Sequence, residues 1–264
     1  YNDGVWIELG QYYINNGLYF SQGAPEGAAF ISQFDGQYAR CSNRASGNFF
    51  LLFNVDDNYI FDQLGPVDLT VTYYDRGTGN WRIDYDARDN NWKVGPEIKK
   101  TNTQTWKTET VRLLDARFAN RANGVDFRLN AKWDAGEDDD YFAFVKIKKV
   151  STSTVSGTVQ DTNPSIPVLL EGAQVTLTDL DFSNVSYSAT TDGAGNFSIA
   201  DVAVGTYRLT VSLAGYETYS TTVEVDESGA TILAELVEGF LGFEDSLWPE
   251  KSSGATFAID KTTS

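Results

Sequence analysis

Short segments that alternate strictly between apolar and polar side chains constrain this fold more than any other feature. In VDLTVTYYD (67–75) every second residue up to Tyr73 is apolar, and the residues between them are polar or charged. WRIDYD (81–86) alternates in the same way, with Trp81 and Tyr85 on the apolar face. A period of two residues is typical of a strand with one buried face. The pattern therefore predicts that Tyr73, Trp81 and Tyr85 belong to a hydrophobic core.

The five residues RGTGN (76–80) separate these two segments and contain two glycines. A short loop of this composition favours a β-hairpin between the flanking strands. Tyr74 falls on the face opposite to Tyr73, so we expect its ring to be exposed. With Arg76 beside it, Tyr74 is a candidate for ligand contact.

Other parts of the chain repeat the same strand-and-turn style. Strand-like segments before residue 151 include FFLLFNV (49–55), WKTETVRLL (106–114), VDFRLNA (125–131) and YFAFVKIKKV (141–150). Later ones, richer in Thr and Val, are GAQVTLTD (172–179), GNFSIADV (195–202), GTYRLTVSLAGY (205–216) and YSTTVEVD (219–226). Short strands with frequent turn signals indicate an all-β fold made of sandwiches, the first of jelly-roll type.

Aromatic and charged residues divide the chain near residue 150. Of the 36 Phe, Trp and Tyr residues, 26 precede residue 151. Residues 1–150 carry 17 basic and 21 acidic side chains, a net charge of −4, whereas residues 151–264 carry 3 and 16, a net of −13. We expect one domain over 1–151 and a smaller one over 152–238. Residues 239–264 fit neither, and they are either a tail or the start of a truncated third domain.

Missing residue types exclude several functions. The chain has no histidine, which excludes His-dependent nucleophilic catalysis and His-liganded metal sites. Its single cysteine, Cys41, cannot form an internal disulfide, and we expect it to be a small buried side chain. The second part lacks the basic patch that nucleic acid requires. No apolar run approaches the ~20 residues that span a bilayer, so membrane insertion is not expected.

The first 150 residues resemble a known module. The resemblance is carried by FNVDDNYIFD (53–62), TVTYYDRGTGNWRIDYDA (70–87), TNTQTWKTETVRLLDARFANRANGVDFRL (101–129) and YFAFVKI (141–147). These stretches look like the galactose-binding-like, jelly-roll carbohydrate-binding modules of secreted bacterial proteins. The resemblance implies a β-sandwich, and it implies a polysaccharide or cell-surface glycan as partner. Residues 1–48 match it least, and loops there can decide what is bound.

The second part resembles a different family. Here the similar stretches are SGTV (156–159), EGAQVTL (171–177), TDGAGNFSI (191–199) and VGTYRLTVSLAGYE (204–217). They look like the carboxypeptidase-regulatory-like, transthyretin-like fold over residues 155–237. The resemblance implies a non-catalytic spacer. FLGFEDSLWP (240–249) is faintly similar to the opening of adhesin-type jelly rolls.

Sugar recognition needs an exposed flat ring together with amide, guanidinium or carboxylate groups that bond hydroxyls. RDNNWKVG (88–95) has this composition in a predicted loop. The alternative is a Trp92 ring that folds back onto the sandwich. The candidate carbohydrate-binding residues are Trp92, Asn91, Tyr74, Arg76, Asn120, Arg121 and Asn123.

Acidic turns raise the question of a metal ion, because calcium takes several oxygen ligands. Jelly-roll modules of the kind that the chain resembles often carry a structural calcium ion, and the residues offered for it here are Asp56, Asp57 and Asp62. Their spacing does not match an EF-hand, so the sequence leaves open whether calcium is bound. For WDAGEDDD (133–140) we favour a solvated acidic turn. A glycosidase needs two carboxyl groups facing each other across a cleft, whereas the acids here lie in turns or alternate outward on strands. We therefore expect no catalysis.

Two functions remain open. The first is a non-catalytic carbohydrate-binding and targeting region of a secreted multimodular bacterial protein, located outside the cell or on its surface. The alternative is a structural subunit of an extracellular fibre, sheath or adhesive layer. In that case residues 239–264 would add a strand to a neighbouring copy of the chain.

Overall fold

The computed structural model describes residues 3–21, 30–132, 138–163 and 165–239. Within these ranges the chain consists of nineteen strands and one short 3₁₀ helix, η1 (Arg44–Ser46). The predicted all-β class is confirmed. Within the same ranges, no helix is both long and apolar enough to cross a membrane.

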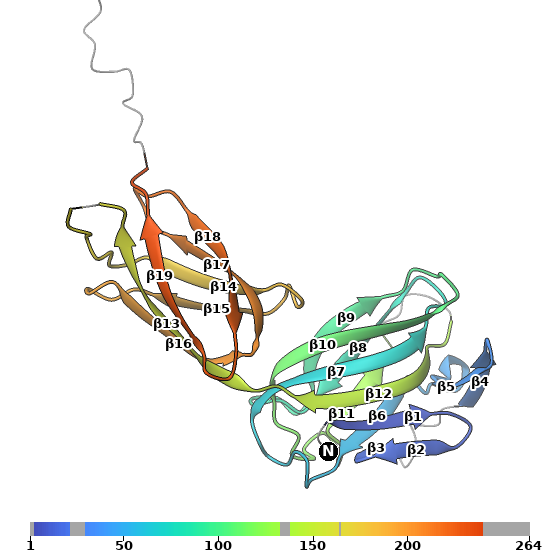
Figure 1. Cartoon of the computed structure of the whole chain (residues 1–264). Coiled ribbons are helices and arrows are strands. Elements are labelled where there is room, and N and C mark those ends of the chain that lie inside the picture. Colours follow the sequence, from blue (N-terminus) through green and yellow to red (C-terminus); the bar gives the residue numbers. More distant parts are fainter. Residues whose placement is uncertain (1–2, 22–29, 133–137, 164, 240–264) are drawn as a thin grey trace, which may run out of the picture.

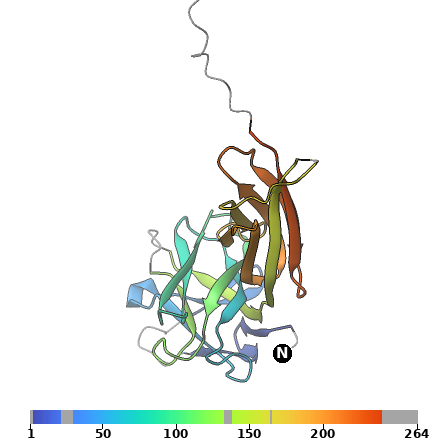
Figure 2. The ribbon, with the colours of Figure 1, turned by 90° about the vertical axis from the view of Figure 1, so that its left-hand side faces the viewer.

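Two sheets form the first sandwich (Figures 1 and 2). One has the order β10-β7-β12-β1-β2, with β5 pairing β12 and β4 pairing β5, and it faces the viewer in Figure 1. The other, behind it, has the order β3-β6-β11-β8-β9. The strands are β1 (Val5–Leu9), β2 (Tyr13–Asn16), β3 (Leu18–Ser21), β4 (Phe30–Phe34), β5 (Gln37–Cys41), β6 (Phe50–Val55), β7 (Gly65–Tyr74), β8 (Asn80–Tyr85), β9 (Lys93–Lys99), β10 (Trp106–Ala116), β11 (Phe127–Asn130) and β12 (Tyr141–Lys149).

The core of this sandwich lies between its two sheets and is rich in rings. Tyr73, Trp81 and Tyr85 are all buried, as the alternation predicts. The Trp81 ring contacts Tyr73 and Phe142 edge-on, with ring centroids 5.2 Å apart in each pair. Edge-to-face packing suits the charge distribution of aromatic rings and adds to the gain from burial. Cys41 is also buried, as expected, and burial raises the pKa of its thiol to about 12.

The hairpin predicted at 76–80 is wrong. β7 and β8, which flank this loop, belong to different sheets, so the connection crosses from one layer to the other. Strand alternation does not distinguish the two arrangements, because two facing strands turn their apolar residues toward each other across the core. The contact between Tyr73 and Trp81 is such an inter-sheet contact.

The second sandwich packs a three-stranded sheet, β16-β13-β19, against a four-stranded sheet, β15-β14-β17-β18. Its strands are β13 (Thr152–Asp161), β14 (Gln174–Asp179), β15 (Ser186–Thr190), β16 (Asn196–Ala203), β17 (Gly205–Ser212), β18 (Tyr219–Val225) and β19 (Ala230–Leu236). β13 and β19 pair in parallel, whereas the other pairs are antiparallel. Gly157 on β13 is required here, since a Cβ atom would lie 2.2 Å from the carbonyl oxygen of Ile232.

The junction between the sandwiches is short and hydrogen-bonded. Only Val150 and Ser151 separate β12 from β13. Val150 donates its N–H to the Pro66 carbonyl, and the Ser151 carbonyl accepts from the Val204 N–H. The linker is therefore bonded to both sandwiches.

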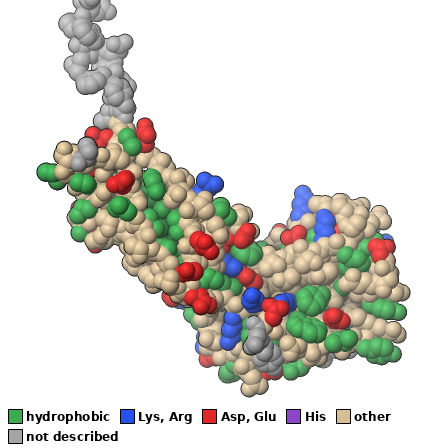
Figure 3. Space-filling model, viewed as in Figure 1, with side chains coloured by type: hydrophobic (Ala, Val, Ile, Leu, Met, Phe, Trp, Pro, Cys, Tyr) green, Lys and Arg blue, Asp and Glu red, His purple; other side chains and the backbone are tan. Residues whose placement is uncertain are grey.

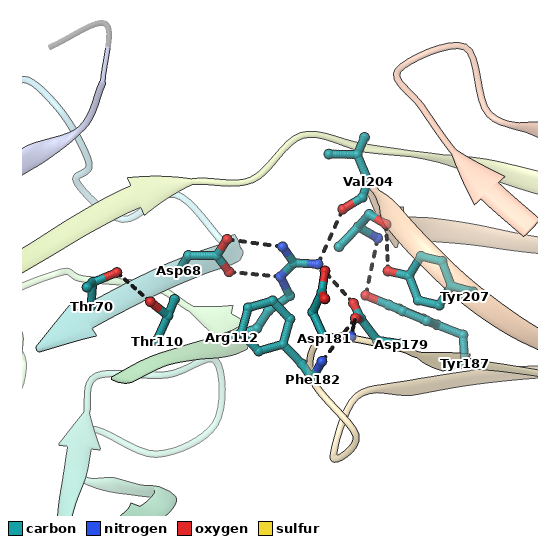
Figure 4. Close-up of polar contacts among 11 residues, drawn as sticks. Asp68, Thr70, Thr110, Arg112, Asp179, Asp181, Phe182, Tyr187, Val204 and Tyr207 are labelled. Carbon is teal, nitrogen blue, oxygen red and sulfur yellow. Dashed lines mark hydrogen bonds and ion pairs between the residues drawn. The ribbon is translucent and has the colours of Figure 1, made fainter. Parts of the chain in front are cut away.

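A buried arginine of the first sandwich reinforces this junction (Figure 4). Arg112 on β10 holds Asp68 through two hydrogen bonds of 2.8 and 3.0 Å. Its Nη1 donates to Asp179 of the second sandwich at 3.0 Å and to the Val204 carbonyl at 3.3 Å, and its guanidinium lies over the Phe182 ring. Two opposite charges and a ring surround the cation, which offsets the cost of taking it out of water.

Candidate functional site

A groove opens on the outer face of the seven-stranded sheet because β12 changes neighbours along its length. Its first residues pair with β5, with Tyr141 opposite Cys41, whereas the following stretch pairs with β1, with Phe144 opposite Glu8. Ala143 lies at the change-over, where the register of β12 against β7 also shifts. The gap between β1 and β5 leaves β12 as its floor.

This groove has a volume of about 400 Å³. We call it the outer groove, and its lining residues are Glu8, Gly10, Gln37, Tyr38, Ala143 and Phe144. Phe144 and Tyr38 are half-buried, whereas Glu8 and Gln37 are exposed. Figure 3 shows hydrophobic side chains gathered over β12, β1 and β2 on this face. The volume falls in the range of about 300–1,000 Å³ that is usual for ligand sites.

Aromatic rings and hydroxyl groups continue the surface beyond the groove. The Trp6 ring lies 6.2 Å from the Phe144 ring, with 30° between their planes. On the other side of β12, β7 and β10 carry two threonine pairs on the same face. The hydroxyl oxygens are 2.8 Å apart for Thr70 and Thr110, and 2.9 Å apart for Thr72 and Thr108. Flat rings thus lie next to groups that donate and accept hydrogen bonds.

The β4–β5 hairpin forms one wall of the outer groove. Its turn uses Asp35 and Gly36, both with positive φ, as tight two-residue hairpin turns require. Phe34, just before the turn, stacks on Tyr74 with centroids 4.1 Å apart and contacts Tyr141 edge-on at 4.8 Å. The hairpin is therefore folded over one end of the sheet's outer face.

Tyr74 is buried, with 8% of its surface exposed, so the expectation that its ring is exposed is wrong. It does lie on the outer face, as the alternation predicts, but Phe34 covers it and Trp106 packs against its edge. Arg76 remains exposed, with its guanidinium 5.9 Å above the Tyr141 ring. Whether Tyr74 or Arg76 contacts a ligand stays a prediction.

Trp92 and Asn91 lie at the opposite sheet, at the start of β9. Trp92 is half-buried and packs against Leu52, Ala122 and Val125. The Arg128 guanidinium lies 4.3 Å from the centroid of the Trp92 ring. Trp92 is thus folded back onto the sandwich, which is the alternative that the sequence left open.

Asn91 and the loop at 119–124 come together in space. The Asn91 amide donates to the Arg121 carbonyl at 3.0 Å, and Arg121 pairs with the buried Asp86 at 2.6 Å. Asn120 donates its backbone N–H to Asp126 and its side-chain amide to Asp57. These bonds occupy Asn120 and Arg121 in holding the loop.

Asn123 completes the set of sequence candidates. It is exposed, with a φ of 56° in the left-handed region that asparagine tolerates better than most residues. The structure therefore brings Asn91, Trp92 and the 119–124 loop to one end of the sandwich, and it places Tyr74 and Arg76 elsewhere.

The three aspartates offered for calcium make protein contacts. Asp62 pairs with Arg117, Asp57 accepts from Asn120, and Asp56 accepts from the backbone and side chain of Asn58. Among the described residues, no group of three or more Asp, Glu, Cys or His side chains is placed to hold a metal ion.

In the acidic stretch WDAGEDDD, residues 133–137 lie outside the described part of the chain. Asp140 is 2% exposed and lies 2.6 Å from the Lys100 ammonium, which is 1% exposed. The expected solvated turn is therefore wrong for Asp140. A buried ion pair of this kind compensates two charges that would each be costly alone.

The sequence prediction missed the residues of the outer groove. Alternation in YFAFVKIKKV places Phe142 and Phe144 on the same face. The irregularity at Ala143 instead sets Phe142 against Tyr73 in the core and Phe144 against Thr72 on the outer face. A β-bulge of this kind reverses the facing of the next residues and leaves no clear mark in a single sequence.

Comparison with known proteins supports the resemblance of the second sandwich. Residues 154–236 match the carboxypeptidase regulatory-like domain. This range runs from β13 to the end of β19. A search of curated proteins finds no match to the chain.

Parts of the chain are similar to several solved structures. A type II cohesin–X-dockerin complex from Acetivibrio cellulolyticus is 27% identical, with a TM-score of 0.25, over 33% of this chain and 58% of its own. A shaft pilin of Lactobacillus rhamnosus GG is 14% identical, with a TM-score of 0.27, over 67% and 98%. A minor pilin of Streptococcus agalactiae is 13% identical, with a TM-score of 0.33, over 68% and 85%. These scores are too low to define a common arrangement, and the chain spans 58% of the cohesin-complex chain.

Proposed function

We propose that the chain is a non-catalytic carbohydrate-binding region of a secreted multimodular protein, and that the outer groove receives the glycan. The observation that carries this proposal is a hollow of about 400 Å³ on the solvent side of a sheet, lined by the rings of Tyr38 and Phe144. Rings that face solvent beside polar groups mark interaction surfaces.

Each part of the groove has a role in this proposal. The ring of Phe144 in the groove, and the ring of Trp6 just beyond it, offer flat apolar surfaces on which the C–H face of a pyranose stacks. Gln37 supplies an amide that both donates and accepts, and Glu8 supplies a carboxylate that accepts from hydroxyl groups. Binding by such contacts is weak for each sugar and suits the targeting of an attached partner to a polymer.

The groove is suited to binding rather than to hydrolysis. Glycoside hydrolysis requires two carboxyl groups across the scissile bond, about 5–10 Å apart. Among the described residues that line the groove, Glu8 is the only carboxylate. This arrangement supports the proposal of a non-catalytic module.

We propose residues 1–151 as the binding domain and residues 152–238 as a spacer, with residues 239–264 as a tail or the start of a further domain. The match of residues 154–236 to the carboxypeptidase regulatory-like domain supports the spacer role. A polysaccharide partner places the protein outside the cell or at its surface. The acidic charge of −17 argues against nucleic acid as a partner.

Affinity electrophoresis and calorimetry against plant, algal and microbial glycans test this proposal. We expect at least one neutral glycan to retard the chain, and Phe144→Ala to weaken that binding at least tenfold, about 1.4 kcal/mol. Phe61→Ala is the matched control, because Phe61 is 52% exposed and lies outside the groove. Retardation by no glycan, or equal binding by a folded Phe144→Ala variant, contradicts the proposal.

The alternative, a structural subunit that assembles by strand addition, depends on residues 239–264, of which only Gly239 is described. Light scattering of the full chain and of a chain ending at Glu238 separates the two functions. Polymers that disappear on truncation favour the alternative, whereas a monodisperse chain that still binds glycan favours the outer groove.

A further inference from the structure

Arg128 on β11 lies close to two aromatic rings on the outer face of the five-stranded sheet. The carbon at the centre of its guanidinium is 3.9 Å from the Phe50 ring centroid and 4.3 Å from the Trp92 ring centroid. Both rings attract the cation and shield part of it from water. The N–H groups of Arg128 donate hydrogen bonds in the plane of the guanidinium.

Some of the N–H groups in this plane form no hydrogen bond with the described part of the chain. The Arg128 Nε donates to Asp84 at 2.8 Å. The two Nη atoms form no hydrogen bond within the described part of the chain, and neither is buried. The side chain as a whole is 18% exposed. Up to four N–H groups in a rigid planar fork are therefore open to an incoming group.

The carboxylate of Asp84, which pairs with Arg128, also accepts hydrogen bonds from other side chains. Asp84 is 1% exposed and also accepts from the Arg82 Nε at 2.8 Å and from the Asn130 amide at 2.6 Å. These partners hold Asp84 in place from three sides. Asp84 in turn fixes Arg128 through Nε, so the fork is oriented before any ligand arrives, which lowers the entropic cost of binding.

From this geometry we propose a second binding site, separate from the outer groove, in which Arg128 takes the carboxylate of an acidic sugar. A carboxylate matches the planar fork of the two Nη atoms and binds it through two parallel hydrogen bonds. The ligand class is a polysaccharide that contains uronate residues.

The rim of this site favours a sugar over an acidic peptide. Asn91 and Asn123 carry exposed amide side chains; Asn91 precedes Trp92 in the sequence, and Asn123 follows Ala122, which packs with Trp92. The Asn91 amide nitrogen is already bonded to the Arg121 carbonyl, which leaves its oxygen to accept from a hydroxyl group. Hydroxyl groups around a carboxylate are a property of uronates.

The negative charge of the chain does not prevent this interaction. Of the net −17, residues 1–150 carry −4, and the larger part belongs to residues 151–264. At physiological ionic strength, charges farther apart than about 8 Å are largely screened. Contacts at Arg128 therefore decide the local interaction, and we expect binding to weaken as salt is added.

Calorimetry of the full chain with polygalacturonate and with its methyl ester tests the proposal without a variant. The two polymers share a backbone, and esterification removes the carboxylates. We expect polygalacturonate to bind at least tenfold more tightly. Equal binding of the two polymers overturns the proposal, and equal binding of poly-glutamate overturns the assignment to a sugar.

Arg128→Lys keeps the charge and removes the planar fork, so it should weaken polygalacturonate binding at least tenfold. Arg88→Lys is the matched control, since Arg88 is an exposed arginine outside this cluster. A folded Arg128→Lys variant that binds as well as the wild type contradicts the proposal. Phe144→Ala reports on the outer groove and Arg128→Lys on the second site, so comparing the two variants on polygalacturonate and on a neutral glycan distinguishes failure of one site from failure of the other.

Discussion

Asp126 is a carboxyl group whose ionisation opposes folding. It has no exposed surface and accepts the backbone N–H groups of Val55 and Asn120 at 2.9 and 3.0 Å. Burial raises its pKa to about 6, and the nearby carboxylates of Asp86 and Asp57 act in the same direction. The two backbone hydrogen bonds only partly oppose this increase.

The pKa of Asp126 sets a pH window for stability. Folded Asp126 keeps its proton up to about pH 6, whereas the unfolded side chain loses it near pH 4. Below pH 4, Asp126 therefore contributes its full stabilisation to the folded chain. As the pH rises through 6 this contribution is lost, and the free energy of unfolding falls by about 3 kcal/mol.

We expect Asp126→Asn to remove this part of the pH dependence. Urea unfolding at several pH values between about 4 and 7 measures it, with Asp89→Asn as the control because Asp89 is exposed. An unchanged slope in Asp126→Asn would show that Asp126 is already ionised in the folded chain.

At the scale of elements, the β4–β5 hairpin protects one end of the seven-stranded sheet. Phe34→Ala removes the ring that covers Tyr74 and Tyr141 and should lower the free energy of unfolding by about 2 kcal/mol. Because the hairpin also carries Tyr38, the variant should weaken glycan binding in the outer groove. Denaturant unfolding and calorimetry measure the two effects.

Ile31→Ala is the control on the same hairpin, since Ile31 is 41% exposed. It should change stability by less than about 0.5 kcal/mol, as surface substitutions usually do. Equal losses in the two variants would mean that the Phe34 stack does not hold the hairpin.

Elements were predictable from the sequence where local pattern alone determines the result. Alternation correctly assigned Tyr73, Trp81 and Tyr85 to the core, because the period of a strand depends only on the backbone. It did not reveal that Phe144 turns outward, since this follows from an irregularity at Ala143. Nor did it reveal that Tyr74 is covered, because Phe34 lies 40 residues away in the sequence.

The candidate sites show the same limit. Asn91 and Trp92 stand out in the sequence because a ring in a polar loop is unusual in composition, and whether they bind a ligand stays a prediction. Arg128 does not stand out, since a lone arginine in a strand is ordinary until the fold brings Phe50 and Trp92 close to it. Pairing partners and covering segments are long-range properties, and a single sequence carries no direct record of them.

At the scale of the whole molecule, Arg112 ties the two sandwiches together. Arg112→Met keeps much of the side-chain volume but leaves Asp68 and Asp179 without their shared cation. Removing one partner of a buried ion pair commonly costs 3–5 kcal/mol. We expect calorimetric unfolding to separate into two transitions and small-angle scattering to show a wider range of shapes.

Arg208→Met, the matched control, changes the exposed arginine of β17 within the second sandwich. It should leave one transition and the scattering curve unchanged. A compact Arg112→Met chain with the wild-type curve would show that the linker alone fixes the junction.

The two-residue linker has a mechanical consequence. Val150 and Ser151 are both tied down by backbone hydrogen bonds, so the connection holds almost no spare length. Tension applied to the two sandwiches would pass directly from β12 into β13, with the Arg112 contacts bearing part of the load. The molecule would then transmit a pulling force with little elongation, unlike two domains joined by a flexible linker.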